Sequence, residues 1–399
     1  MGKNVMLMVP LLDQGGLERI CAMTAKLLTP HCRLTLVVFS TKGMIYDVSG
    51  VDMIDLHLCS VPGKVGKAVN LCKRIRAIKK IKRERNIEIT YSFGPTANLA
   101  NVFSRVRTKG AGRKPSTDQI WIGIRGYGAL QEKKSMRRLC KRADRVICCS
   151  KVMADEVRQQ FGAGDVVCIY NPCDVESIRQ LAEEKLPADR QAFFADGASV
   201  VAAMGREHDV KGFWHLIKAY ALAKKEIPSL KLMIVGEGTF AEYRKLAADL
   251  QVEKDVLFTG VQKNPFAYLK QASLFVMTSV SEGFPNSLIE AMAVGLPAMS
   301  VNCKTGPAEI FLEDYRTGQE EHCVIEGEYG ILLPVINPAK NLDASVIEKE
   351  EEIMAQQMVN ILTNNKKLED AGKASESRAH FFDKDNYCKK LLDMIYEGV

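Results

Sequence analysis

Short apolar runs alternate along the chain with stretches in which apolar residues recur at helical spacing. The first run, Lys3 to Pro10, ends near the turn Gly15-Gly16, and a helical pattern from Ile20 to Leu28 separates it from a second run, Leu34 to Phe39. Strand, glycine turn, helix and strand in this order form a βαβ unit, with which a doubly wound parallel sheet begins. The pattern therefore predicts an α/β protein.

At 399 residues the chain is too long for one ordinary hydrophobic core, so we expect two domains. Its composition, 47% hydrophobic and 26% charged, is that of a globular protein. No apolar run approaches the roughly 20 residues that span a bilayer. The start of the chain is interpreted as a first strand and not as a signal peptide.

The segment Ser281 to Pro297 combines a strand end, a tight turn and a helix start. The turn Gly283-Phe284-Pro285 breaks a strand-like run, and a helix is expected from near Ser287 to Gly295. The first amides of a helix lack partners within it and carry the positive end of its dipole. An anion such as phosphate can therefore bind at this turn.

Two carboxylates, Glu282 and Glu290, flank the turn. A carboxylate beside a phosphate site is unfavourable unless it accepts hydrogen bonds from hydroxyl groups, and a sugar or a ribose offers hydroxyls in pairs. The two glutamates are therefore candidates for holding two parts of one ligand. The spacing from Ser287 to Glu290 also fits a capping box, in which Glu290 bonds only to the start of its own helix.

The sequence EGFPNSLIEAMAVGLP, from Glu282 to Pro297, closely resembles the E-x7-E signature of the family 4 glycosyltransferases, retaining enzymes of the GT-B fold that use nucleotide sugars. The segment Ser300 to Ile310 is similar to the one that follows it in polysaccharide-assembly members. The resemblance implies that Glu290 holds the ribose hydroxyls and Glu282 the donor sugar. It also implies a lining for the sugar and diphosphate, formed at Gly283, Phe284, Asn286, Ser287 and Leu288.

A second loop carries two cations. The strand-like run Ser199 to Met204 leads into Gly205 to Gly212, which contains Arg206 and Lys211. Two cations between a strand end and a helix start are well placed to bind a diphosphate. The resemblance implies the same role, because the family carries the Arg and Lys of its pyrophosphate site in such a segment.

In the first half of the chain the resemblance indicates Gly16 and Arg125. A similar G-G-x-E-R segment of the family lies over the donor phosphates and the acceptor, which makes Gly16 a candidate; the alternative is a turn that needs only glycine geometry. Many family members carry a histidine near the position of Arg125. This chain has none there, so Arg125 is expected to contact the acceptor or the donor, and the alternative is a salt-bridged strand end.

The resemblance also implies the domain organisation, two Rossmann-like domains that face a cleft. Residues 1–172 are expected to form the acceptor-binding domain, and residues 173–383 the nucleotide-sugar-binding domain. A helix at residues 384–399 is expected to cross back to the first domain. The segment Tyr170-Asn171-Pro172 resembles the exit from the first domain of this family.

Positive charge is concentrated in the first half. Residues 1–180 contain 31 Lys and Arg against 15 Asp and Glu, a net charge of +16, and the remainder has a net charge of −9. The basic stretches 64–85 and 133–142 are open to two interpretations: contact with an anionic membrane surface, at about 1 kcal/mol per basic residue near the bilayer, or solvated outer helices. Nucleic acid is not an expected partner, because aromatic residues are not interleaved with the basic ones.

The 12 cysteines include no C-x-x-C pair and no cluster with histidine, which argues against zinc and disulfides and suits a reducing cytosol. Asp383-Lys-Asp385 matches the D-x-D pattern of metal-dependent glycosyltransferases, but it stands at the start of a last helix, where aspartate is a good cap. We therefore expect no metal and no cofactor besides the nucleotide-sugar co-substrate. The expected location is the cytoplasm, with peripheral binding at the inner face of the membrane if the basic stretches bind lipid.

The function favoured is a retaining, metal-independent glycosyltransferase that moves a hexosyl or N-acetylhexosaminyl group from a UDP-sugar to a hydroxyl of a glycan or lipid-linked glycan. One alternative is a nucleotide-sugar epimerase or hydrolase of the same fold. Another is an NAD-linked oxidoreductase, because Gly236-x-Gly238-x-x-Ala241 follows a strand as in a dinucleotide fingerprint. That match is incomplete, since Asp255 precedes the next strand instead of closing it.

Overall fold

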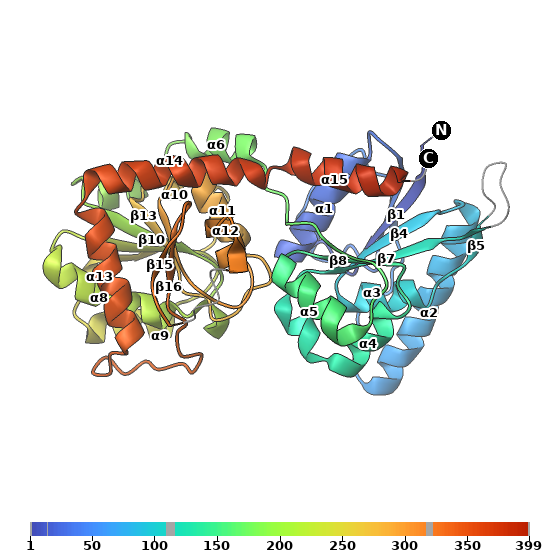
Figure 1. Ribbon diagram of the computed structural model, residues 1–399, viewed down its shortest axis with the longest axis horizontal. Helices are drawn as coiled ribbons and strands as arrows, with labels where there is room; N and C mark the ends of the chain where they lie inside the picture. The colour runs from blue at the N-terminus through green and yellow to red at the C-terminus, as the bar shows by residue number, and fades with distance from the viewer. Residues whose placement is uncertain (1, 14, 109–115, 317–321, 398–399) are drawn as a thin grey trace. The chain divides into compact units, whose positions relative to one another are not determined.

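The computed structural model describes residues 2–13, 15–108, 116–316 and 322–397 (Figure 1). The chain divides into two compact units. The first consists of Met1–Pro172 with Lys384–Val399, and the second of Cys173–Asp383. Among the described residues no helix is long and apolar enough to cross a membrane.

The first unit is built on a parallel sheet in the order β3-β2-β1-β4-β7-β8-β9. The chain places β2 and β3 on one side of β1 and the later strands on the other, so the strand order reverses beside β1, as in a Rossmann sheet. A small antiparallel pair, β5 and β6, forms a separate sheet. The strands are β1 Asn4–Val9, β2 Arg33–Val38, β3 Met53–Asp55, β4 Ile89–Phe93, β5 Arg107–Thr108, β6 Ser116–Thr117, β7 Gln119–Ile124, β8 Arg145–Cys148 and β9 Val166–Cys168.

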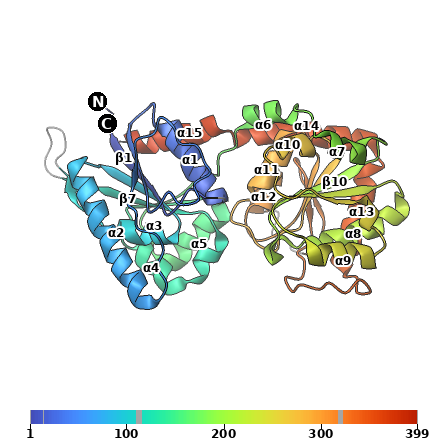
Figure 2. The same cartoon turned by 180° about the vertical axis from the view of Figure 1, so that it is seen from behind.

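Helices cover both faces of this sheet (Figures 1 and 2). Val5, Leu7 and Val9 of β1 pack into one core with α1 and α15, and Met6 and Met8 pack into another with α2 and α3. Because successive side chains of a strand point to opposite faces, a strand covered on both faces is apolar throughout. The helical segments are α1 Gly16–Leu28, α2 Lys64–Glu84, α3 Pro95–Val102, η1 Tyr127–Gln131, α4 Lys133–Cys140, α5 Lys151–Phe161 and α15 Lys384–Tyr396.

The last helix, α15, is part of the first unit although it follows the second in the sequence. Its residue Tyr387 forms a hydrogen bond of 2.8 Å with the hydroxyl of Thr24 on α1. The hydroxyl of Tyr396 donates to the carbonyl oxygen of His31 at 2.6 Å. Leu391 is fully buried between these two contacts, so α15 completes the core on the α1 side of the sheet.

The second unit repeats the architecture with a sheet in the order β12-β11-β10-β13-β14-β16-β15, in which only β15 is antiparallel to its neighbour. The prediction of two doubly wound α/β units is therefore confirmed. Its strands are β10 Val200–Met204, β11 Lys231–Val235, β12 Val256–Phe258, β13 Leu274–Met277, β14 Ala298–Val301, β15 Ile325–Glu326 and β16 Ile331–Leu333. Its helical segments are α6 Val175–Ala182, α7 Ala188–Gln191, η2 Ala192–Phe194, η3 Asp209–Lys211, α8 Phe213–Glu226, α9 Ala241–Asp249, η4 Glu253–Asp255, α10 Phe266–Leu269, α11 Asn286–Ala293, α12 Pro307–Phe311, α13 Lys349–Leu362 and α14 Asn365–Phe381.

The basic stretch 64–85 forms the helix α2, but several of its charges do not face solvent. Lys82 is fully buried, and Arg74 is buried with its guanidinium donating to the carbonyl oxygen of Leu58. Arg85 pairs with Asp52. The buried Lys82 and Arg74 therefore do not add to a basic surface, and the exposed charge of the first half of α2 comes from Lys64, Lys67 and Lys73.

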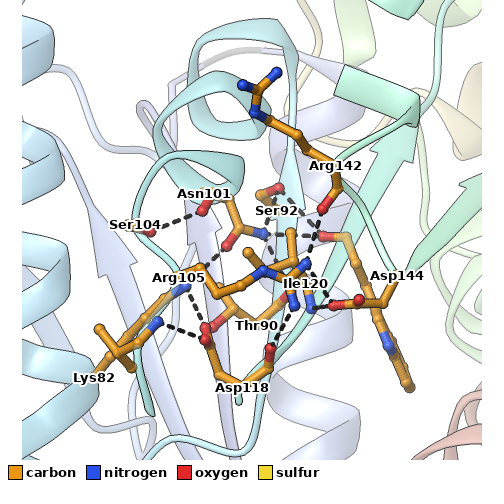
Figure 3. A network of polar contacts seen from close by, with 12 residues as sticks. Lys82, Thr90, Ser92, Asn101, Ser104, Arg105, Asp118, Ile120, Arg142 and Asp144 are labelled. Carbon is orange, nitrogen blue, oxygen red and sulfur yellow. Dashed lines mark hydrogen bonds and ion pairs between the residues drawn. The ribbon is translucent and has the colours of Figure 1, made fainter. Parts of the chain in front are cut away.

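The buried Lys82 lies in a network of polar groups between α2, α3 and the start of β7 (Figure 3). Its ammonium group donates to Asp118 at 2.7 Å and to the side-chain oxygen of Asn101 at 3.1 Å. The other carboxylate oxygen of Asp118 accepts from the backbone amide of Val106. Burial lowers the pKa of Lys82 to about 8 and the charge of Asp118 opposes this shift, so the lysine remains protonated at neutral pH.

Replacing Lys82 by methionine should destabilise the protein by about 3–5 kcal/mol, because Asp118 would be left as an uncompensated buried charge. The free energy of unfolding, measured by chemical denaturation, tests this. Lys80→Met is the matched control, since Lys80 is an exposed lysine of the same helix that pairs with Glu84 at 3.8 Å, and it should cost less than about 1 kcal/mol. Equal losses in the two variants would contradict the buried ion pair.

Candidate active site

In the second unit the strand order reverses between β10 and β13, since β11 and β12 extend the sheet in one direction and β13 and β14 in the other. Loops that follow β10 and β13 leave the same edge and diverge, and in such sheets ligands bind at this point. Here the two loops are joined by a hydrogen bond of 2.9 Å from the amide of Val280 to the carbonyl oxygen of Val210. The candidate site therefore begins at the carboxyl ends of β10 and β13.

The loop after β10 ends in a tight segment, His208–Gly212, which we call the lysine turn. His208 caps it, because its Nδ1 accepts from the amide of Val210 at 3.1 Å. Thr278, directly after β13, donates from its hydroxyl to the carbonyl oxygen of Lys211 at 2.9 Å. Gly212 closes the turn with φ +59°, and a Cβ there would lie 2.3 Å from the carbonyl oxygen of Thr278. Both the conformation and the close approach therefore require glycine.

Lys211 and Glu282 form the central contact of the site. The ammonium group of Lys211 donates to Oε1 of Glu282 at 2.6 Å, and the two side chains are 19% and 15% exposed. The loop that carries Glu282 is held by Thr305, whose hydroxyl donates to the carbonyl oxygen of Glu282. The buried thiol of Cys303 lies near this pair, and burial, with the charge of Glu282, raises its pKa well above the usual range. The sequence assigned Lys211 and Glu282 to different parts of a ligand, and the structure brings them together.

Arg206, the second cation of the loop, is exposed, and its side chain has no ion pair with any residue that the structure describes. The backbone beside it is fixed, because the amide of Glu207 donates to the carbonyl oxygen of Glu237 at 2.6 Å. Arg206 therefore offers a charge to solvent at the edge where Lys211 stands.

The helix α11 begins at Asn286, one residue before the predicted start. Pro285 is its N-cap and no side chain caps it, so the capping-box alternative for Ser287 and Glu290 is wrong. Glu290 is 5% exposed. The amide of Leu288 is bonded to the carbonyl oxygen of Pro285 at 3.2 Å. Gly283 and Phe284 are buried, whereas Asn286 and Ser287 are half-buried, so the surface at the start of this helix comes from the latter two.

The two remaining candidates, Gly16 and Arg125, belong to the first unit. Gly16 is exposed at the first position of α1, after β1. Arg125 follows β7 and is 9% exposed; it donates to Asn171 at 2.8 Å, to the hydroxyl of Tyr91 and to the carbonyl oxygen of Ile169. These three acceptors are uncharged, and through them Arg125 ties β4, β7 and the segment after β9 together.

The glycines of the dinucleotide-like motif serve loop packing. A Cβ on Gly236 would lie 1.9 Å from the carbonyl oxygen of Gly205, and one on Gly238 would lie 2.4 Å from Cβ of Glu207. They allow the loop after β11 to pack directly against the loop that carries Arg206. Asp255, which stands before β12, pairs with Lys224 at 3.0 Å. The motif thus contributes to the shape of the candidate site, and the described residues directly after β12, Thr259 to Gln262, include no acid for the ribose of a dinucleotide.

One group of possible metal ligands was not predicted from the sequence. His215, Glu348 and Glu351 bring ligand atoms within 4.8 Å of one another. The two ring nitrogens of His215 are already bonded, to Glu351 at 2.7 Å and to the carbonyl oxygen of Asn337 at 2.9 Å. Glu348 and Glu351 form the capping box of α13. The group is therefore a packed contact between α8 and α13, and its residues are too distant in sequence for any spacing to indicate it.

The structure also contains a cavity of about 400 Å³ in the second unit. Its lining includes Ala298 and Ile331, the first residues of β14 and β16. It lies at the amino edge of the sheet, opposite the edge at which α/β sheets bind ligands. We therefore do not assign it to the candidate site.

The comparisons with known proteins agree with this fold. A family model described as "Glycosyltransferase Family 4" matches residues 14–177, and one described as "Glycosyl transferases group 1" matches residues 186–319. Among solved structures, Anabaena HepE in complex with UDP and glucose superposes with a TM-score of 0.72 at 17% identity, covering 98% of this chain and 99% of that one. The lipopolysaccharide galactosyltransferase WaaB superposes with a TM-score of 0.66 at 18% identity, and each chain is fully covered.

These likenesses define the chain as a protein of the GT-B fold. A relative from Campylobacter jejuni, named as an N-acetylgalactosaminyltransferase that acts on a diphospho-undecaprenol-linked sugar, is 27% identical over 96% of this chain and 97% of its own length. An uncharacterized glycosyltransferase of Methanocaldococcus jannaschii is 31% identical, but the match spans only 49% of this chain and 48% of that protein. The two family models, the likeness to the Campylobacter relative over nearly its whole length and the structural neighbours together support a family 4 glycosyltransferase. The epimerase, hydrolase and oxidoreductase alternatives are not favoured.

Replacing Gly212 by alanine should distort the lysine turn, because the new Cβ would overlap the carbonyl oxygen of Thr278. We expect a loss of about 2–4 kcal/mol in the free energy of unfolding, of which about 1 kcal/mol is the cost of positive φ. Gly260→Ala is the control, since Gly260 has φ +71° with open space around its Cβ position. If both variants lose the same stability, the close packing of the turn on β13 is not a constraint.

Proposed function

We propose that this glycosyltransferase transfers a hexosyl or N-acetylhexosaminyl group from a UDP-sugar to a hydroxyl of a glycan or lipid-linked glycan, with retention of configuration and without a metal ion or other cofactor. The observation that carries the proposal is the contact of Lys211 with Glu282 at the point where the strand order of the second unit reverses. A cation and a hydroxyl-binding carboxylate there match the two halves of a nucleotide sugar.

In this proposal the diphosphate is bound by Lys211 and Arg206 together with the first amides of α11. Breaking the bond between the anomeric carbon and the diphosphate leaves negative charge on the leaving oxygen. Two cations and aligned amides stabilise that charge, as a divalent metal ion does in other enzymes. Glu282 accepts from hydroxyls of the donor sugar, and Glu290 from those of the ribose.

The transfer itself needs no nucleophile from the protein. The acceptor oxygen forms the new bond to the anomeric carbon on the face from which the diphosphate departs, which preserves configuration. The acceptor proton passes to the departing phosphate oxygen, so charge and atoms balance. Arg125 and Gly16 are proposed to act on the acceptor side; the bonds of Arg125 to Asn171 and Tyr91 would then make it a support for that surface.

The ion pair seen here adds one requirement. Lys211 is already neutralised by Glu282, so a diphosphate has to share this lysine or take it over from the carboxylate. Sharing leaves the carboxylate able to accept from a sugar hydroxyl beside the phosphate. The pair therefore sets the distance between the site for the diphosphate and the site for the sugar.

The relatives support the choice of substrates. HepE has been solved with UDP-glucose and with UDP, and the Campylobacter relative is named for transfer to a lipid-linked diphosphate acceptor. Other relatives are named for polysaccharide or lipopolysaccharide synthesis, among them a lipopolysaccharide core glycosyltransferase of Rhizobium meliloti that is 30% identical over 45% of this chain. UDP-sugars and lipid-linked glycans are therefore the first substrates to test.

The test is a screen of UDP-sugars with a labelled lipid-linked acceptor in the presence of EDTA. Product with one added sugar and the anomeric configuration of the donor supports the proposal. Lys211→Ala should lower turnover about 100- to 1,000-fold, the usual effect of losing one group that stabilises the leaving charge. Lys245→Ala, an exposed lysine of α9 paired with Asp249, should leave turnover unchanged.

Three outcomes would contradict parts of this proposal. Altered free sugar without transfer would favour an epimerase or hydrolase. A strict need for Mn²⁺ would contradict metal independence. Near wild-type turnover of Lys211→Ala would remove this lysine from the mechanism.

We further propose that the first unit binds the cytoplasmic face of an anionic membrane, where a lipid-linked acceptor is found. Two apolar residues of the first half of α2, Val65 and Val69, are 78% and 50% exposed, one helical turn apart, among the exposed lysines named above. Such a mixture of apolar and basic groups is typical of segments that lie in a membrane interface. The basic charges of α4 and the residues after it are exposed as well: Lys133, Lys134, Arg137, Arg138, Lys141 and Arg142.

The double variant Val65→Asp/Val69→Asp should reduce binding to vesicles that contain anionic lipid, because it removes the apolar contact and adds repulsion. Flotation of the full-length protein with anionic and with neutral vesicles measures this. Val346→Asp is the control, since Val346 is 41% exposed in the second unit. Unchanged flotation of the double variant, or equal binding to neutral vesicles, would contradict this surface.

A further inference from the structure

We infer that Lys340 is a positioning residue for the lysine turn: it pairs with Asp209, two residues before Lys211, and so keeps that carboxylate from competing with the diphosphate for Lys211. The inference rests on the proposed function of that turn. Lys340 lies far from Lys211 in sequence and in no recognised motif.

Lys340 belongs to an irregular segment, residues 334–348, which we call the strap and which joins β16 to α13. The strap is fastened to α8 at two places. His215 Nε2 bonds to the carbonyl oxygen of Asn337 at 2.9 Å, and Lys218 donates to the carbonyl oxygen of Val346 at 2.8 Å. Because His215 and Lys218 are fully buried, these two bonds fix the strap on the helix that directly follows the lysine turn.

The strap also contacts the turn itself, through Lys340 and Ile336. Lys340 Nζ lies 3.1 Å from Oδ1 of Asp209 and 2.5 Å from Oε2 of Glu242 on α9, and 5.5 Å from the centre of the Tyr243 ring. Ile336 of the strap is buried, and its Cδ1 lies 3.3 Å from the position of a Cβ on Gly212. One side of the turn is therefore held by the strap and α9, and the other by β13.

The charges of Asp209 and Lys340 affect how a diphosphate binds to Lys211. Asp209 precedes Lys211 by two residues, and a carboxylate so close to a phosphate site would repel the ligand or compete for the lysine. Lys340 neutralises Asp209, and Glu242 and the face of Tyr243 hold Lys340 in place. The Lys340 side chain is 26% exposed, whereas those of Asp209 and Glu242 are 64% and 60% exposed, so the group is a small surface network with a modest effect on binding. Its partners raise the pKa of Lys340 well above the usual range, which keeps it charged.

The experiment compares binding of UDP and of uridine by the full-length protein, with titration calorimetry for UDP and saturation-transfer NMR for uridine. Lys340→Met should weaken UDP binding by about 3- to 10-fold, the effect of losing a small network of ion pairs, and should change uridine binding less than about 2-fold. Lys340→Arg should restore UDP binding. Asp209→Asn and the double variant Asp209→Asn/Lys340→Met should lose no more than Lys340→Met alone, because the two residues act as one unit.

Lys245→Met serves as the matched control, because it removes a lysine of α9 that pairs only with its own helix, and it should bind UDP as the wild type does. Wild-type UDP affinity in Lys340→Met would overturn the inference, and so would an equal loss for UDP and uridine, which would indicate general disruption. If the wild-type protein itself does not bind UDP, the proposed function fails instead.

Discussion

The reversal of strand order beside β10 is the constraint on which the second unit depends. A parallel strand must be covered on both faces, so successive helices pass to opposite sides, and the loops after β10 and β13 separate at one edge of the sheet. Short contacts join the loops at this edge. Thr278 and Val280 form hydrogen bonds with the lysine turn, and Gly236 allows the loop after β11 to pack directly against the loop after β10. These contacts fix the backbone of the two loops that carry Lys211 and Glu282.

Much of the fold could be predicted, because strands buried on both faces are visible as apolar runs. The run from Leu34 to Phe39 corresponds to β2, and the run from Ser199 to Met204 corresponds to β10. Helix starts were less certain. The sequence suggested a capping box at Ser287, whereas the helix begins at Asn286 behind Pro285, whose fixed φ suits the residue before a helix.

The candidate site was predicted in its residues but not in its contacts. Local motifs indicated Glu282 and Lys211, yet their pairing joins positions 71 residues apart, which no local pattern reports. Lys340 was missed for the same reason, since its partner Glu242 is 98 residues away. Charge counting also failed at Lys82. A lysine on a basic helix is normally solvated, and only the three-dimensional structure shows that Lys82 forms a buried ion pair with Asp118.

The position of α15 has a consequence for biosynthesis. Tyr387, Cys388, Leu391 and Ile395 belong to the core of the first unit, but the ribosome makes them after the whole second unit. The second unit is continuous in sequence and can fold while the chain is still attached to the ribosome. The core of the first unit stays incomplete, with the apolar side of α1 uncovered, until α15 leaves the exit tunnel. During translation this side is an apolar surface that a chaperone could bind.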